Sequence, residues 1–255
     1  MHSHPPSDLL TAYYRRDDLL RRRNVSDVVL SGMLDLAPLP ARLVDDCERE
    51  IVRLGLEAGD VEPLSLARAR VRWPGYAGSV QAVSAWMESL GLADVWAGSD
   101  QALMACRGAK YHHDAAHYGS KAFCNLFLSE DNGLDLHFPK AGHRIPLTRG
   151  LAVIFDTAQP HAVIRRNAAT FDAQDFASSQ DCTQLFLTWE LPLDNARLAR
   201  ALGIRQDLGT AGAPQQAPDP EQGQGLDHAQ ESGYLRVNGE AAKLCPQTGR
   251  WLPVS

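Results

Sequence analysis

Two histidines and one aspartate are the residues whose types and spacing point most directly to chemistry. His112 and Asp114 lie two positions apart in the stretch YHHD. In an extended strand, side chains two positions apart point to the same side, so an imidazole and a carboxylate would converge there. His161 supplies a second imidazole, directly after a Gln-Pro turn. Two imidazoles and one carboxylate on one face, with other positions left open, are the ligands with which many proteins hold Fe(II).

The histidine and aspartate pair alone is weak evidence, because the chain has nine histidines and a chance match is easy. Its context gives it weight, since His161 follows a strand-like run and a turn. His113 lies between His112 and Asp114, and we expect it to point away from the metal and to support its neighbours from outside.

The segments that must position these residues are predicted to be short strands. They are apolar or alternating runs separated by Gly, Pro, Asn and Asp, at residues 123–128, 134–138, 150–155, 161–165 and 183–190. Such a series indicates a sandwich-like or barrel-like β core. We therefore expect a mainly β protein with flanking helices.

The order of four motifs resembles a known family. HHD at 112–114 is followed by LDLHFP at 134–139, RGLAVIFD at 149–156 and PHAV at 160–163. This order is similar to the double-stranded β-helix, or jelly-roll, of Fe(II)/2-oxoglutarate-dependent dioxygenases of the prolyl-hydroxylase-like branch, over roughly residues 100–192. The resemblance implies Fe(II), a 2-oxoglutarate cosubstrate and O2. It also implies that His112, Asp114 and His161 are the metal ligands and catalytic residues of a hydroxylase.

The cation that would bind the distal carboxylate of 2-oxoglutarate departs from the family pattern. The family usually carries it on the strand after the distal histidine, but residues 170–190 contain no Lys or Arg. By the two-residue period of a strand, Arg165 shares a face with His161 and Arg166 points the other way. Arg165 is therefore our preferred residue, with Lys121 and Arg149 as alternatives. A guanidinium suits the role because its planar fork binds a carboxylate through two hydrogen bonds.

Further expectations concern the pocket and the substrate. In the resembled family, polar residues at the position of Asn125 contact 2-oxoglutarate; a hydrogen-bonded core asparagine is the equal alternative. Halogenating members lack the carboxylate that Asp114 supplies, which favours hydroxylation here. The substrate would be a small amino-acid-like or anionic metabolite, or a protein side chain. A basic rim formed by Arg70, Arg72, His143 and Arg144 would suit an anionic one.

A function of another class stays open. The chain could be a non-catalytic or cupin-like metal-binding β-helix that acts as a binding module, and the missing downstream cation favours that alternative. The net charge of −6 argues against nucleic-acid binding, which needs a basic face. No apolar run approaches membrane-spanning length, and five cysteines without CxxC spacing fit a reducing cytoplasm.

The organisation along the chain predicts four parts. Residues 1–99 form a partly helical support region, in which the charged first 35 residues are expected to be helical in part and further helices follow Pro40 and lie near 79–91. Within this region, residues 68–76 alternate basic and apolar side chains and are expected to form a strand or loop at the mouth of the site. Residues 100–205 form the catalytic core, and Asp194 is expected to cap a short helix at 195–202. Residues 206–232 are rich in Gln, Pro, Gly and Ala, which is typical of a flexible linker or loop. Residues 233–255 contain a hairpin with an Asn-Gly turn. Because an isolated hairpin is unstable, it must dock on the main domain, on a partner, or on a second subunit in a homodimer.

Overall fold

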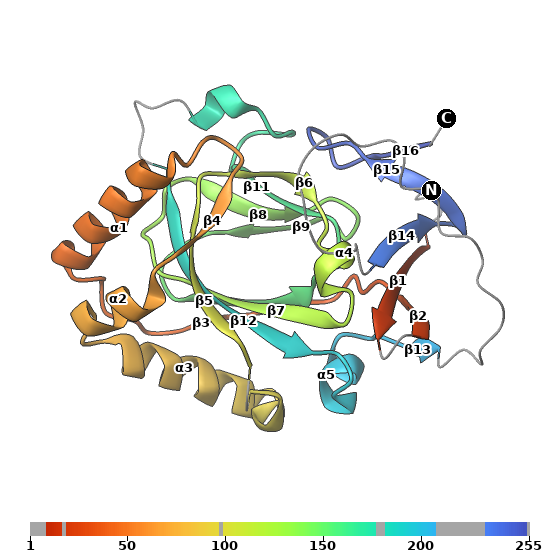
Figure 1. Cartoon of the computed structure of the whole chain (residues 1–255), viewed down its shortest axis with the longest axis horizontal. Helices are drawn as coiled ribbons and strands as arrows, with labels where there is room; N and C mark the ends of the chain where they lie inside the picture. The colour runs from red at the N-terminus through yellow and green to blue at the C-terminus, as the bar shows by residue number, and fades with distance from the viewer. Residues whose placement is uncertain (1–8, 17–18, 97–98, 177–181, 208–232, 254–255) are drawn as a thin grey trace, which may run out of the picture.

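Two facing sheets form the centre of the molecule. The computed structural model describes residues 9–16, 19–96, 99–176, 182–207 and 233–253, and the following statements concern these residues. The larger sheet has the order β3-β10-β7-β12-β5-β4, and the smaller has the order β6-β11-β8-β9 (Figure 1). The strands of the larger sheet are β3 (Val29–Met33), β4 (Val61–Leu64), β5 (Gln101–Cys106), β7 (Lys121–Phe127), β10 (Leu151–Asp156) and β12 (Gln184–Pro192). Those of the smaller sheet are β6 (Ala109–His112), β8 (Leu134–Phe138), β9 (His143–Pro146) and β11 (His161–Arg165).

The strand order identifies a double-stranded β-helix. From β5 to β12 the chain crosses repeatedly between the sheets, and β12, the last strand, pairs with β5, the first, and with β7. All these pairings are antiparallel. The predicted fold class, a mainly β protein with flanking helices around a jelly-roll core, is therefore confirmed.

Alternation along the strands divides the apolar residues into two cores. On β7, Phe123 and Phe127 belong to the core between the sheets, whereas Cys124 and Leu126 belong to the core outside the larger sheet. This follows from the two-residue period of a strand buried on both faces. The inner core is rich in phenylalanine, and it surrounds the position where His161 enters β11.

Helices cover the outer face of the larger sheet, as Figure 1 shows on its left and lower sides. They are α1 (Ala41–Leu54), α2 (Leu66–Arg72), α3 (Tyr76–Ser89) and α5 (Ala196–Ala201); a single turn, α4 (Ala115–Tyr118), and two 3-10 turns, η1 (Ala93–Val95) and η2 (Ala173–Phe176), complete the set. The helix predicted after Pro40 is α1, which ends at Gly55 in the left-handed conformation. None of the described helices combines the length and apolar character needed to cross a membrane.

The expectation of helix in the first part of the chain is wrong for residues 10–16, 19–24 and 29–33. These residues form β1 (Leu10–Arg16), β2 (Leu19–Asn24) and β3. The physical reason is long-range pairing, since β3 extends the larger sheet beside β10 and β1 pairs with a strand near the C-terminus. Charged side chains on β1 and β2 made this segment resemble a solvated helix.

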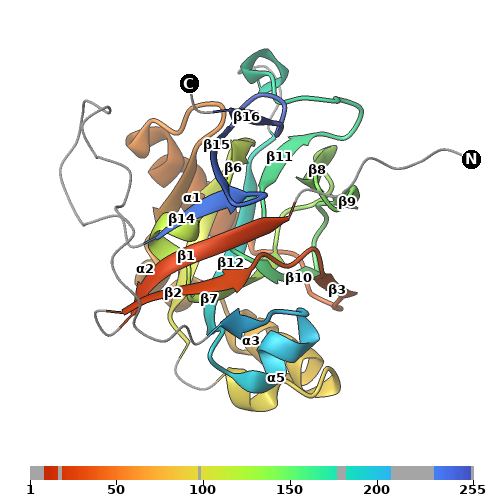
Figure 2. The ribbon, with the colours of Figure 1, turned by 90° about the vertical axis from the view of Figure 1, so that its right-hand side faces the viewer.

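A third sheet joins the two ends of the described chain (Figure 2). Its order is β13-β2-β1-β14-β15-β16, where β13 is Gln206–Asp207, β14 is Gly233–Val237, β15 is Glu240–Leu244 and β16 is Trp251–Pro253. The predicted hairpin is confirmed as β14 and β15 around Asn238 and Gly239, both at positive φ. It docks on this chain's own β1, although most of the predicted linker, residues 208–232, lies outside the described residues.

The turn after this hairpin also contacts the smaller sheet. The backbone N–H of Tyr111 donates to the carbonyl of Pro246 at 2.8 Å, so the turn covers the outer edge of β6. Gly249 then lies so close to Tyr111 that an added Cβ would be 2.7 Å from its ring. The C-terminal segment thus supports the strand that carries His112, and the domain boundaries predicted from the sequence remain a prediction.

We expect Gly249→Ala to destabilise the protein more than Gly239→Ala. Both glycines have positive φ, so each alanine costs about 1 kcal/mol in backbone strain. Only Gly249 is in close contact, with Tyr111 and Pro139, whereas nothing lies within 4 Å of the Cβ position at Gly239. Overpacking should cost about 1–3 kcal/mol more in the free energy of unfolding, measured by denaturant titration. Equal losses in the two variants would show that the turn does not pack on β6.

Candidate metal centre

The three predicted ligands come together at one edge of the smaller sheet. His112 is the last residue of β6, His161 is the first residue of β11, and the two are direct partners in the antiparallel register. Asp114 follows at the start of α4. One donor atom from each of the three lies within 4.8 Å of the other two. The carboxylate of Asp114 is 3.8 Å from Nε2 of His112 and 3.7 Å from Nε2 of His161.

Backbone carbonyls orient both imidazole rings. Nδ1 of His112 lies 2.7 Å from the carbonyl of Lys110, and Nδ1 of His161 lies 2.8 Å from the carbonyl of Gln159. A carbonyl accepts only, so each Nδ1 carries the proton and each Nε2 keeps its lone pair. This is the usual arrangement of metal-binding histidines, in which the second nitrogen is held by an acceptor.

The electrostatics of the site favour a bound cation. Burial, together with the neighbouring His112, holds the pKa of His161 well below its ordinary value, so its imidazole is neutral at pH 7. Burial also raises the pKa of Asp114, against the opposing effect of His112, His113 and His117. A buried carboxylate without a cation is costly, and a divalent ion bonded to all three residues would remove that cost.

Aromatic rings form the wall behind the site. The ring of Phe155 lies 4.9 Å from that of His161, and Phe138 lies 6.1 Å from it. Phe123 packs edge-on against Phe155. These side chains keep water from the inner side of His161, which is 7 % exposed. A dry wall strengthens charge interactions at the donor atoms.

Arg165 and Arg166 point to opposite sides of β11, as the period of the strand predicts. The guanidinium of Arg165 lies 5.7 Å from the ring of Phe176, a residue of the core between the sheets. It also donates to the carbonyls of Asp175 and Asn132, at 2.9 and 3.1 Å. Arg166 instead pairs with Asp135 and Asp131 on the outer side. The role of Arg165 in binding a cosubstrate stays a prediction.

The alternative cations have carboxylate partners. Lys121 is 3.8 Å from Glu190, and Arg149 is 2.6 Å from Glu130. Asn125 lies on the inner face of β7, between Val153 and Thr188 of the neighbouring strands. It is 7 % exposed, and the side-chain oxygen has no hydrogen-bond partner among the described residues. An unsatisfied buried polar atom that faces the interior of the β-helix fits a ligand contact better than a structural role.

The predicted basic rim is wrong for its arginines. Arg70 and Arg72 belong to α2, which packs on the outer face of the larger sheet, and they bond to Gln101 and Asp46. Arg144 pairs with Asp135 on the outer side of the smaller sheet. The sequence pattern of 68–76 favoured a strand or loop, but residues 68–72 belong to α2, and Arg68 and Arg72 pair with Glu50 and Asp46 of α1.

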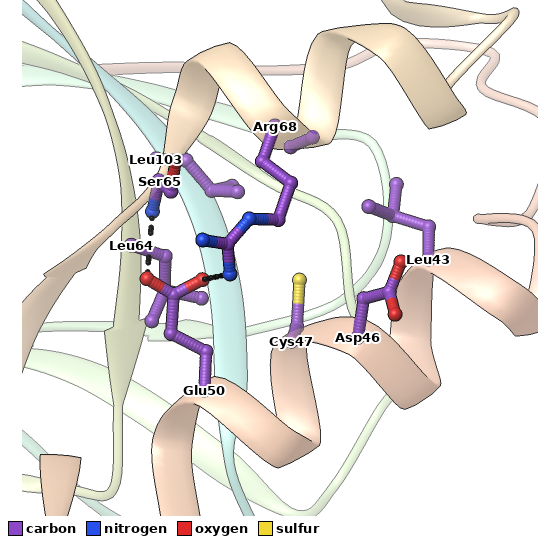
Figure 3. A pocket seen from close by; sticks show the side chains of 9 residues that line it. Leu43, Asp46, Cys47, Glu50, Leu64, Ser65, Arg68 and Leu103 are labelled. Carbon is purple, nitrogen blue, oxygen red and sulfur yellow. Dashed lines mark hydrogen bonds and ion pairs between the residues drawn. The ribbon is translucent and has the colours of Figure 1, made fainter. Parts of the chain in front are cut away.

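Figure 3 shows this helix contact, at a small open hollow between α1 and α2. Arg68 reaches Glu50, whose other oxygen accepts from the backbone N–H of Ser65. Burial, with Glu50 and Glu48 nearby, raises the pKa of the Cys47 thiol to about 11. A protonated thiol and ion-paired carboxylates do not make a reactive site, so the hollow belongs to the packing of the helices.

Sequence reasoning missed the residues that support the ligands. The acceptors for the two histidines are backbone carbonyls, and Trp251 lies beside His113 with ring centres 6.2 Å apart. A carbonyl acceptor leaves no signal in residue type. The sequence did offer one signal, an aromatic residue after a turn at Trp251. The contact of Trp251 with His113, however, depends on the docking of β14 on β1.

Comparisons with known proteins yield weak likenesses. No family model and no curated protein matches the sequence. Among solved structures, the chain is similar to a viral collagen prolyl hydroxylase from Paramecium Bursaria Chlorella virus-1, with 10 % identity over 64 % of this chain and 89 % of that one, at a TM-score of 0.39. It is also similar to a Pseudomonas putida prolyl-4-hydroxylase, with 18 % identity over 64 % and 92 % of the two chains, at 0.36. A third is the Escherichia coli ribosomal oxygenase YcfD, with 10 % identity over 87 % and 52 %, at 0.29.

We expect His112→Ala, Asp114→Ala and His161→Ala each to abolish tight Fe(II) or Co(II) binding and to leave the fold intact. Outer-shell changes at metal sites cost about 10–100-fold in affinity, and loss of a direct ligand should cost more. Anaerobic calorimetric titration measures the affinity, and circular dichroism checks the fold.

His113→Ala is the matched control for these variants. Nδ1 of His113 is buried without a partner among the described residues, so its removal should cost little, and metal affinity should stay near that of the parent. If His161→Ala binds the metal as tightly as the parent, the proposed ligand set is wrong. The same follows if His113→Ala is the only variant that loses metal binding.

Proposed function

We propose that this chain is an Fe(II)- and 2-oxoglutarate-dependent dioxygenase that hydroxylates its substrate. The observation that carries the proposal is the convergence of His112, Asp114 and His161 at one edge of a double-stranded β-helix. Two imidazoles and one carboxylate leave open positions on the metal for other ligands. When bound, Fe(II) would supply the redox chemistry that couples decarboxylation of 2-oxoglutarate to reduction of O2.

The chain's own residues would hold, orient and shield the reacting groups. The backbone acceptors at Lys110 and Gln159 keep both Nε2 atoms directed to one point. Phe155 and Phe138 exclude water from the inner side. Asp114 occupies the position that halogenating members of the resembled family leave open, so hydroxylation, or a related oxidation, is the reaction that the ligand set favours.

Arg165 is the residue that we propose for the distal carboxylate of 2-oxoglutarate. It lies four residues beyond His161 on the same face of β11, which corresponds to about 13 Å between Cα atoms. Its side chain lies on the inner side of the β-helix, where a desolvated carboxylate requires a cation. Asn125, on the facing sheet, would supply a second polar contact through its side-chain amide.

The proposed substrate is an amino-acid-like or anionic metabolite, or a protein side chain. With the arginines of the expected rim engaged elsewhere, Lys121 and Glu190 supply one charge of each sign where β7 begins and β12 ends. Both are partly exposed and loosely paired, which suits a group that carries an ammonium and a carboxylate. A screen of amino acids and short peptides for 2-oxoglutarate-dependent oxidation tests the substrate class.

A metal-binding β-helix without 2-oxoglutarate turnover is the second candidate. Its support is that Arg165 already donates to two backbone carbonyls and that no Lys or Arg lies within 170–190. Release of succinate from 2-oxoglutarate with Fe(II) and ascorbate, without substrate, separates the two candidates. Slow uncoupled release supports the dioxygenase, and none at any 2-oxoglutarate concentration supports the binding module.

We expect Arg165→Ala to raise the apparent KM for 2-oxoglutarate by at least about tenfold, because hydrogen bonds to charged groups contribute about 1.5–3 kcal/mol. Arg166→Ala is the control, since Arg166 pairs with Asp131 and Asp135 on the opposite face. Its KM should stay close to that of the parent. An unchanged KM in Arg165→Ala would transfer the role to Lys121 or Arg149. An unchanged KM for 2-oxoglutarate in alanine variants of Arg165, Lys121 and Arg149 would contradict the 2-oxoglutarate assignment.

A further inference from the structure

We infer that Arg23, on a strand outside the β-helix, is a positioning residue of the metal centre. It holds the turn at 156–159, and that turn in turn holds Asp114 and His161. The inference rests on the proposed metal site for its consequence, but the hydrogen bonds that carry it are independent of any metal.

Arg23 and Asp156 form a fully buried ion pair. Their side chains are 0 % exposed, and two parallel hydrogen bonds of 2.6 and 2.7 Å join the guanidinium to the carboxylate. The same carboxylate accepts from the backbone N–H groups of Ser26 and Ala158, both at 2.9 Å. Such a bidentate pair fixes the relative position of two segments more closely than a single bond does.

The turn that Asp156 begins carries the acceptors for two ligands. The carbonyl of Thr157 accepts from the backbone N–H of Asp114 at 2.8 Å. The carbonyl of Gln159 lies 2.8 Å from Nδ1 of His161 and sets its ring orientation. Within the turn, the N–H of Gln159 donates to the carbonyl of Asp156. A shift of Asp156 would therefore move both acceptors together.

Arg23 also holds the segment on the other side of Asp114. Its Nε donates to the carbonyl of Gly119 at 2.9 Å, at the end of α4. The hydroxyl of Thr157 lies 2.7 and 2.9 Å from the carbonyls of Tyr118 and Lys121, which share its one proton. Arg23 thus bonds directly to both segments that meet at Asp114, the α4 segment and the 156–159 turn.

A positioning role explains why a charged pair is buried here. The desolvation of two charges offsets much of their attraction, so a buried pair is weak evidence for stability. Its hydrogen bonds are directional, however, and an apolar pair of the same size would not orient the turn. Arg23 itself is set by β2, which lies between β13 and β1, and β1 in turn pairs with the C-terminal strand β14.

The test compares Arg23→Met and Arg23→Lys with the parent protein in two measurements. The first is hydrogen exchange of the Asp114 amide, by NMR, in metal-free protein. The second is Co(II) affinity and the Co(II) absorption spectrum. We expect Arg23→Met to speed exchange at Asp114 at least about tenfold and to weaken Co(II) binding about tenfold, within the range for outer-shell changes. Arg23→Lys keeps the charge without the fork, so it should change both readouts less and in the same direction.

Arg166→Met is the matched control. It removes an arginine from the buried Asp135 and touches none of the bonds at residues 156–159, so exchange at the Asp114 amide and the Co(II) spectrum should stay close to those of the parent. If Arg23→Met folds and its Asp114 amide exchanges at the parent rate, the inference is overturned. If Arg23→Met does not fold, the same result in Arg23→Lys overturns it. If exchange at Asp114 is faster in Arg23→Met but the parent binds no Co(II), the result supports the positioning of Asp114 by Arg23. It contradicts the proposed metal site instead.

Discussion

The pairing of β6 with β11 is the interaction on which the candidate site depends. It sets His112 directly opposite His161, and the turn after β6 then brings Asp114 to the same point. β6 lies at the edge of the smaller sheet, where strands are most free to slip or separate. The C-terminal turn covers that edge through the bond from Tyr111 to Pro246. Register is therefore protected at an edge strand, which has one partner within its sheet.

The core between the sheets sets the electrostatic character of the site. Its phenylalanines pack beside His161, where burial lowers the pKa of the imidazole, and burial also raises the pKa of the Asp114 carboxyl. Arg165 also lies against this core, beside Phe176, and donates to the carbonyls of Asp175 and Asn132. In the proposed function, the cation would bind at one end of β11 and the distal carboxylate of 2-oxoglutarate at the other.

Both ends of the described chain contribute to the site from outside the β-helix. β1 and β2 carry Arg23 to the turn at 156–159, and β14 to β16 bring Trp251 beside His113. These elements meet in one sheet, so the N-terminal and C-terminal segments depend on each other. A core that ran only from β5 to β12 would contain all three ligands but would lack the Arg23 bonds to Asp156 and Gly119.

Local patterns in the sequence determined a large part of this protein. The alternation and apolar runs of β7, β8, β10, β11 and β12 predicted these strands, because strand periodicity is a property of neighbouring residues. The spacing of His112 and Asp114 predicted their convergence, but Asp114 reaches the site from the start of α4, with φ −106° and ψ 18°, and not from an extended strand. The same period assigned Arg165 and Arg166 to opposite faces. The Asn-Gly turn between β14 and β15 was also readable, since positive φ favours those residues.

Only the tertiary structure decided what depends on partners far along the chain. β1 and β2 looked like charged helix until β14 supplied their edge, and the arginines of α2 looked like a rim until α1 supplied Asp46 and Glu50. The cap of α5 is likewise Asn195 rather than the expected Asp194. Arg23 stood in a run of three arginines with nothing to distinguish it. Its partner Asp156 is brought to it only by folding, because ion pairs and strand pairings join residues whose distance in sequence carries no record of their distance in space.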